Sequence, residues 1–297
     1  MSLIAILVAM ATEGFWKSIP WLGKFRGVVR FAQWLHGQFG KSAWMNGAMG
    51  VLVTIGPGVL LVAIIQNYLS AGDGLLRWLL LLVFSVAVLV FCIGVRGLNN
   101  QIDQYVTALR HGDPEGAYLH VREILADASP ANPAETNRML LENILIRNNQ
   151  RLLAILFWFV LLGPAGAFMY RSTTQLKGLE GGEREGFLEA VLRLQAILDW
   201  IPARITAICY AVIGSFEDAI HNWRTQADAL GEDVRTRNQG VLVASGFGAL
   251  RLGEAPAQEE DLELFCERIE DAQAMVRRTV IAWLTVFAFL TIAGWMT

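Results

Sequence analysis

The chain has 297 residues, of which 54% are hydrophobic and only 17% are charged, and its formal net charge at pH 7 is −3. Soluble domains carry nearer a quarter charged residues, so this composition argues against a soluble protein. The small net charge argues against a nucleic-acid partner. Three cysteines without a Cys-x-x-Cys pair argue against a disulfide scaffold and a cysteine metal site.

Four long apolar runs contain no Asp, Glu, Lys or Arg: Gly47 to Tyr68, Trp78 to Val95, Leu152 to Tyr170 and Thr279 to Met296. At about 1.5 Å per residue, each run is long enough to cross the roughly 30 Å hydrocarbon core of a bilayer. Buried core helices of a soluble protein are the alternative, but those are usually shorter and interrupted by polar residues. We therefore expect an all-α, polytopic membrane protein with four transmembrane helices in contact with the lipid bilayer.

Residues 1–46 combine an apolar start with a basic aromatic segment. The start lacks the basic residues and cleavage site of a secretory signal, so we expect it to be retained. The bases of the following segment are Lys17, Lys24, Arg26, Arg30 and Lys41, and they alternate with Phe and Trp. Aromatic rings suit the headgroup level and bases attract anionic lipid, which predicts an amphipathic interfacial helix on the cytoplasmic face.

Residues 47–95 read as a transmembrane hairpin, because only a short connection with Asp73 and Arg77 separates its two spans. Gly56, Pro57 and Gly58 predict a kink or close packing in the first span. Residues 96–151 read as a helical connecting region that faces water. The third span, residues 152–170, contains a Gly163–Pro164 break. This break predicts either a packing kink or the lining of a cavity.

Residues 171–278 form the main hydrophilic and amphipathic helical region, and residues 279–297 the C-terminal transmembrane helix. A glycine-rich segment, residues 240–253, lacks the phosphate-binding P-loop pattern, so close helix packing is the expected role. If only four segments cross the membrane, residues 171–278 and their many bases lie outside, in tension with the positive-inside rule. A fifth membrane-embedded element at residues 187–214, re-entrant or spanning, would remove this tension, and so would insertion of the apolar N-terminus into the membrane.

The stretch from Leu198 to Arg224 is the candidate functional segment. Its apolar run, residues 205–214, is too short to cross a bilayer by itself. The candidate ligand-binding residues are Asp199, Trp200, Pro202, Arg204, Trp223 and Arg224. We expect Asp199 and Arg204 to pair, or to share a small ligand at the membrane surface, across Pro202. A surface ion pair worth about 0–1 kcal/mol is the alternative. The histidines are scattered without ligand spacing, so the residues predict no metal site, no cofactor and no catalytic group.

The residues DWIPARITAICYAVIG, followed by GSFEDAIHNWR, resemble the signature of the AmpE/CbiB family of bacterial inner-membrane proteins. The segments FWFVLLGPAGAFMYR (157–171) and NQGVLVASGFGALRLGE (238–254) are similar to further family segments and occur in the same order. One branch of the family is the cobinamide-synthetase type (CbiB, also called CobD), and the other, AmpE, is associated with β-lactamase induction. The resemblance covers most of the chain and is closer to the AmpE branch.

Two departures bear on function. Where the synthetase branch has an E-N-x-x-D-G-like segment, this chain has Arg147 to Arg151; where the branch has an N-T-x-D-like stretch, it has Thr173 to Leu176. Carboxylates are the usual ligands of Mg²⁺ on ATP. The resemblance therefore implies a non-catalytic regulatory protein in the response to β-lactams or cell-wall stress, with a protein partner in that signalling. The alternative is an ATP-dependent amide-forming synthetase of the adenosylcobinamide type.

Overall fold

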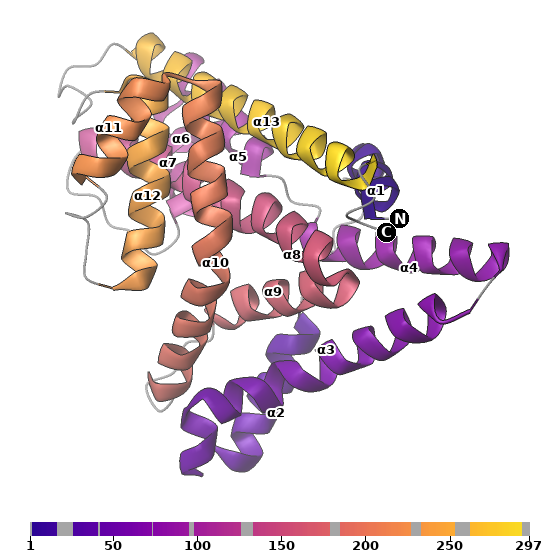
Figure 1. Cartoon of the computed structure of the whole chain (residues 1–297). Coiled ribbons are helices and arrows are strands. Elements are labelled where there is room, and N and C mark those ends of the chain that lie inside the picture. Colours follow the sequence, from indigo (N-terminus) through magenta and orange to yellow (C-terminus); the bar gives the residue numbers. More distant parts are fainter. Residues whose placement is uncertain are drawn as a thin grey trace. The chain divides into compact units, whose positions relative to one another are not determined.

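The computed structural model describes residues 2–16, 26–40, 42–72, 74–94, 98–125, 133–178, 185–226, 233–252 and 262–292. Within these ranges all regular structure is helical (Figure 1), which confirms the all-α prediction. The chain divides into two compact units. Unit 1 comprises Met1–Val95, Leu152–Trp200 and Val286–Thr297, and unit 2 comprises Arg96–Arg151 and Ile201–Thr285.

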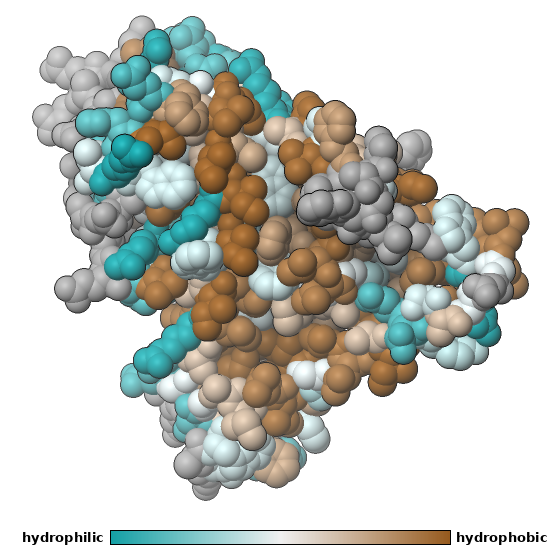
Figure 2. Space-filling model, in the orientation of Figure 1, coloured by the Kyte–Doolittle hydropathy of each residue, from teal (hydrophilic) through white to brown (hydrophobic). Residues whose placement is uncertain are grey.

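Unit 1 contains two long apolar helices joined by a short connection. Its elements are α1 (Ser2–Trp16), α2 (Arg26–Phe39), the short 3₁₀ helix η1 (Ala43–Asn46), α3 (Ala48–Ser70), α4 (Leu75–Ile93), α8 (Ala154–Leu162), α9 (Pro164–Leu176) and the first part of α10 (Glu185–Ile213). Leu60 and Ile64 of α3, and Val83 of α4, are more than 60% exposed. Figure 2 shows apolar side chains over the surface of α3. Exposed leucine and isoleucine on this scale suit a lipid environment.

Four helical segments are long and apolar enough to cross a membrane: Ala48–Ser70, Leu75–Ile93, Glu135–Leu162 and Glu185–Ile213. The first two correspond to the first two predicted spans, whereas their arrangement as a transmembrane hairpin stays a prediction. The third ends at Leu162, not at residue 170, because Gly163 has a φ of 69° and a new helix starts at Pro164. The fourth is α10, so the expected short apolar run is part of a 29-residue helix. The C-terminal span stays a prediction, because residues 293–297 lie outside the described ranges.

The break between α8 and α9 is capped by one side chain from α3. Gln66 Nε2 donates to the Leu162 carbonyl (3.4 Å), and the Ala165 N–H donates to Gln66 Oε1 (3.2 Å). A Cβ at Gly163 would lie 2.5 Å from Gln66 Nε2, so only glycine fits this left-handed position beside the amide. Of the two alternatives for the break, these contacts favour a packing junction.

Unit 2 is built around a core shared by several helices. Its elements are α5 (Leu98–Arg110), α6 (Pro114–Leu125), α7 (Pro133–Asn148), the π-helical turn η2 (Asn149–Leu153, which crosses into unit 1), the second part of α10, α11 (Phe216–Gln226), α12 (Val234–Ala249) and most of α13 (Leu262–Ile292). Ile144, Tyr210 and Ile269 belong to this core. A Cβ at Gly248 would lie 2.4 Å from the Asp218 carbonyl oxygen, so the glycine-rich segment permits close packing of α12 on α11, as expected.

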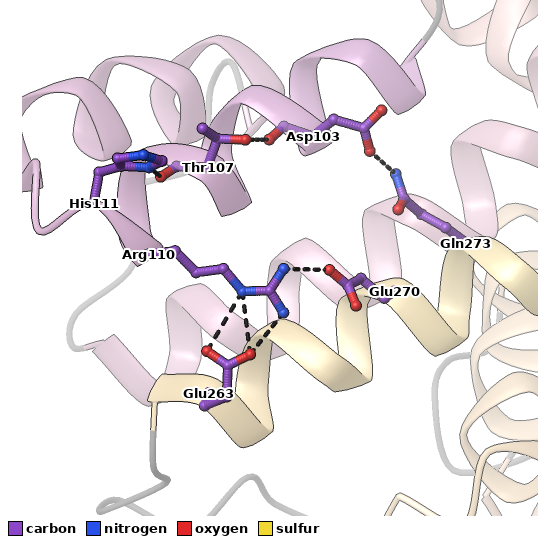
Figure 3. A network of polar contacts seen from close by, with 7 residues as sticks. All are labelled: Asp103, Thr107, Arg110, His111, Glu263, Glu270 and Gln273. Atoms are coloured by element: carbon purple, nitrogen blue, oxygen red, sulfur yellow. Dashed lines mark hydrogen bonds and ion pairs between the residues drawn. The ribbon is translucent and has the colours of Figure 1, made fainter.

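A polar network joins α5 to α13 within unit 2 (Figure 3). Arg110 contacts two carboxylates of α13, those of Glu263 (2.7 Å) and Glu270 (2.6 Å). Gln273, further along α13, donates to Asp103 of α5 (3.0 Å). The hydrogen bonds that Arg110 donates to Glu263 and Glu270 raise the pKa of Arg110 above its ordinary value. Because both carboxylates are about half exposed, this network orients the two helices more than it stabilises them.

Candidate functional site

The first half of the candidate segment lies in unit 1, where Asp199 of α10 is buried. Its carboxylate accepts hydrogen bonds from the Tyr170 hydroxyl of α9 (2.5 Å) and from Gln195 Nε2, one turn earlier on α10 (3.1 Å). A buried carboxylate needs such donors, because an uncompensated charge in an apolar setting is costly. Asp199 thus has the chemistry of a held anion inside the helical unit.

The next part of the stretch passes a proline without interrupting the helix. Pro202 lies inside α10 and is buried, whereas Trp200 is half exposed. Proline has no N–H, so the carbonyl four residues earlier, that of Leu198, loses its helical donor. Trp158 of α8 replaces this donor, because its indole N–H lies 3.1 Å from the Leu198 oxygen. The proline therefore leaves no bare carbonyl at this point.

The second half of the segment lies in unit 2, where Arg204 of α10 contacts α12. Arg204 Nη1 donates to Oδ1 of the buried Asn238 on α12 (3.1 Å). One turn further along these helices, Ala207 of α10 and Val241 of α12 pack together with Trp223 of α11. Trp223 is half-buried and Arg224 is exposed.

A second arginine lies within electrostatic range of Arg204. Arg237, next to Asn238 on α12, is exposed, and its charge repels that of Arg204. Two arginines close together, Arg204 and Arg237, favour the binding of an anionic group. The indole of Trp223 favours contact with a flat apolar group. The binding of an anionic ligand at Arg204 stays a prediction.

A second polar pair of unit 2 involves the segment that differs from the synthetase pattern. Asn149 begins the π-helical turn, and its Oδ1 accepts from the Thr206 hydroxyl of α10 (2.8 Å). Both side chains are buried. Turns of this kind are frequent at functional sites. Asn148 instead donates back to the Ile144 carbonyl of its own helix (3.0 Å).

The contacts described above therefore do not join the six candidate residues into one site. In unit 2, Arg204 contacts Asn238 of α12, and Trp223 packs against Val241 of the same helix. Asp199 has Tyr170 and Gln195 as partners in unit 1. The expected pairing of Asp199 with Arg204 stays a prediction. Sequence reasoning missed Tyr170, Gln195, Asn149, Thr206 and Asn238; a buried position for a polar residue would have been their signal, but burial does not show in the sequence pattern.

The donor set of the described residues does not form a metal centre. Among the described ranges, no three His, Cys, Asp or Glu side chains come together in a way that could hold a metal ion. Thr173 and Thr174 donate to carbonyls of their own helix α9. Taken together, the fold and these contacts define a multi-pass helical membrane protein with buried polar contacts along one long helix.

The comparisons with known proteins place this architecture in a family. The family model described as CobD/Cbib protein matches residues 6–253, which include the whole candidate segment. The chain therefore belongs to the CobD/CbiB family. Family membership and the four apolar helices together indicate a multi-pass bacterial membrane protein. No solved structure matches the chain.

Curated relatives of two kinds are similar to the chain. A cobalamin biosynthesis protein CobD from Stutzerimonas stutzeri is 30% identical over 244 residues, 75% of this chain and 78% of the relative. A CobD from Chromobacterium violaceum is 28% identical over 243 residues, 79% of this chain and 73% of the relative. Protein AmpE from Shigella flexneri is 27% identical over 312 aligned positions, 99% of each chain. The family resemblance is confirmed, whereas the closer likeness to the AmpE branch is not.

Proposed function

We propose that this chain acts in a membrane-bound step of cobalamin biosynthesis, of the amide-forming type that the synthetase branch implies. The observation that carries the proposal is the match of CobD relatives across three quarters of the chain, in a family whose model covers Asp199, Arg204 and Asn238. This reverses the order of the two functions expected from the sequence, in which regulation came first.

The geometry around Arg204 supports a ligand of this class. A corrinoid is large and flat, and the precursor of an amide bond presents a carboxylate. Arg204, held by Asn238 at 3.1 Å, supplies a guanidinium for such a carboxylate. Trp223, packed against Ala207 and Val241, supplies an apolar indole one turn away. In this proposal Arg204 binds and orients the acid, and Asn238 is a positioning residue for Arg204.

Mg²⁺ on ATP, which the amide-forming reaction implies, does not fit the residues at the two divergent places. At residues 173–176 there is no carboxylate, and the hydroxyls of Thr173 and Thr174 donate to carbonyls of their own helix. The other place is residues 147–151. Arg147 and Arg151 are cations, and Asn149 is already bonded to Thr206. Mg²⁺ prefers carboxylate oxygens. We therefore assign no step to a metal ion held at these positions.

A second candidate function, regulation of β-lactamase induction, has two observations in its favour. The AmpE relative aligns along 99% of both chains, whereas the two CobD relatives above align along less than four fifths. In addition, arginines stand near the positions at which the resemblance puts carboxylates, so a ligand could be bound there without turnover. Under this candidate the Arg204 site senses a ligand rather than transforming it.

A clean deletion of the gene, read out in two ways, distinguishes the two functions. We expect the deleted strain to need cobinamide for growth that depends on cobalamin made from early precursors. The second measurement is β-lactamase activity after induction. Normal cobalamin synthesis together with altered induction would contradict the first proposal and support the second.

Complementation with point variants tests the site itself. Arg204→Met removes the guanidinium while keeping much of the side-chain volume, and Arg193→Met is the matched control because Arg193 is an exposed residue of the same helix. We expect Arg204→Met to fail and Arg193→Met to restore growth, with equal protein amounts in the membrane. Restoration by both variants would remove Arg204 from the proposal.

A further inference from the structure

Helix α2 buries one side in unit 1. Ala32, Leu35 and His36 are buried, and the His36 ring packs edge-on against Phe187 of α10 with the centroids 4.4 Å apart. His36 Nδ1 lies 2.9 Å from the Ala32 carbonyl oxygen of its own helix. Ala32 also joins a small core with Val51 of α3. These contacts fix the rotation of α2 about its axis, and so determine which side chains face outward.

The outward face of α2 is aromatic and continues into η1. Phe31 stacks on Trp34 and Phe39 packs against Trp44, with ring centroids 5.9 Å apart in each pair. Trp34 is 57% exposed and the other three rings are between 36% and 45% exposed. Soluble surfaces rarely leave so many aromatic rings together without a partner. Phenylalanine and tryptophan at this density are typical of the level where lipid headgroups meet acyl chains.

The charged residues in this stretch of the sequence are all basic. Arg30 is exposed on the outward face, one helical turn from Trp34. From residue 14 to residue 72 the sequence contains five Lys or Arg and no Asp or Glu. The chain then enters α3, the first candidate span, at Ala48. The aromatic face is thus only a few residues from a segment whose surroundings are lipid.

We propose that the outward face of α2, made by Arg30, Phe31, Trp34 and Phe39 with Trp44 of η1, binds the headgroups of anionic phospholipids. Arg30 contacts a lipid phosphate, and the rings lie at the boundary between headgroups and acyl chains. Uniform positive charge selects anionic over zwitterionic lipid, and continuity with α3 places the face at membrane depth. This surface is independent of the Arg204 site and of either proposed function.

The proposal is tested with the full-length protein in neutral detergent micelles that contain brominated phosphatidylglycerol or brominated phosphatidylcholine. Quenching of Trp34 is obtained as the difference between the parent protein and Trp34→Phe. We expect half-quenching at a several-fold lower fraction of phosphatidylglycerol than of phosphatidylcholine. Arg30→Gln should reduce this preference about fivefold, the equivalent of roughly 1 kcal/mol per base near an anionic surface. Raising the salt to 0.5 M should weaken it as well.

Two further variants keep the test decisive. Arg193→Gln makes the same change at an exposed arginine of α10 in unit 1 and should leave the preference intact. Gly27→Lys adds a base one turn before Phe31, where a Cβ meets no atom within 4 Å, and should increase the preference even if Arg30→Gln folds poorly. Equal quenching by the two lipids, or no response to either α2 variant, would overturn the proposal. So would a Trp34→Cys variant that forms disulfides between two copies in membranes.

Discussion

Replacing Gln66 by leucine should loosen the junction between α8 and α9. The amide caps both helices at once, because it donates to the Leu162 carbonyl (3.4 Å) and accepts from the Ala165 N–H (3.2 Å). Leucine has similar volume and no polar atom, so both backbone groups lose their partner. Hydrogen bonds between membrane helices are worth about 0.6 kcal/mol on average and a helix cap is worth about 1 kcal/mol. The two contacts together should contribute about 1–2 kcal/mol to the free energy of unfolding of unit 1.

Cys92 offers a direct assay for this prediction. It is a fully buried thiol of α4 in unit 1, whereas Cys209 and Cys266 belong to unit 2. In a background with serine at the other two positions, a thiol-reactive dye reports the opening of unit 1 as the protein is heated in mild detergent. Gln66→Leu should make Cys92 react several degrees earlier than the parent.

Asn67→Leu is the matched control. Asn67 is the next residue of the same helix and is exposed, and its replacement by leucine also removes an amide. It should react at nearly the parent temperature. If the Gln66 and Asn67 variants expose Cys92 at the same temperature, the capping role that we assign to Gln66 is wrong.

Three further predictions follow from single contacts. Trp158→Phe leaves the Leu198 carbonyl without a donor and should lower the free energy of unfolding by about 1 kcal/mol; an unchanged unfolding midpoint in detergent would contradict this. Tyr170→Phe removes a charge-assisted hydrogen bond to the buried Asp199 and should lower the free energy of unfolding by about 1.5–3 kcal/mol. Adding Asp199→Asn should recover part of this loss. If the losses of the two single variants simply add in the double variant, the two side chains are not coupled. The Ser215 hydroxyl, followed by Arg251, holds the pKa of the Asp218 carboxyl below its ordinary value. The ionised Asp218 carboxyl therefore stabilises the folded state above its unfolded pKa near 3.8, and this stabilisation is lost as the pH falls through the lower folded pKa. Asp218→Asn should remove this part of the pH dependence of unfolding, which is measured by acid titration.

The sequence pattern predicted the helices that are uniformly apolar and missed those whose polar groups are paired inside the fold. Residues 47–68 and 78–95 contain no charge, and they correspond to α3 and α4. Helix α10 is as long as a span but contains Arg193, Asp199 and Arg204. A search for apolar runs without charged residues therefore does not recognise α10 as one helix, although Asp199 is buried and hydrogen-bonded to Tyr170.

For the candidate site, the motif pointed to one helix but not to its partners. Asp199 and Arg204 lie close together in the sequence, in the segment DWIPAR, whereas Tyr170 lies 29 residues from Asp199 and Asn238 lies 34 residues from Arg204. Contacts across such separations depend on how helices pack, and periodicity within one helix carries no information about them. The expected change at Gly163 and Pro164 was visible in the sequence, but its capping residue, about 100 positions earlier in α3, was not.

The hydrogen bond from Trp158 to the Leu198 carbonyl links the roles of two residues that lie far apart in the sequence. Proline at position 202 creates the need for a donor, and tryptophan at position 158 meets it. A relative that replaces the proline regains the helical N–H and has no further use for the indole, whereas one that keeps the proline but loses the tryptophan has a bare carbonyl in an apolar setting. Selection should therefore keep or discard these two residues as a pair, although 44 positions separate them in the chain.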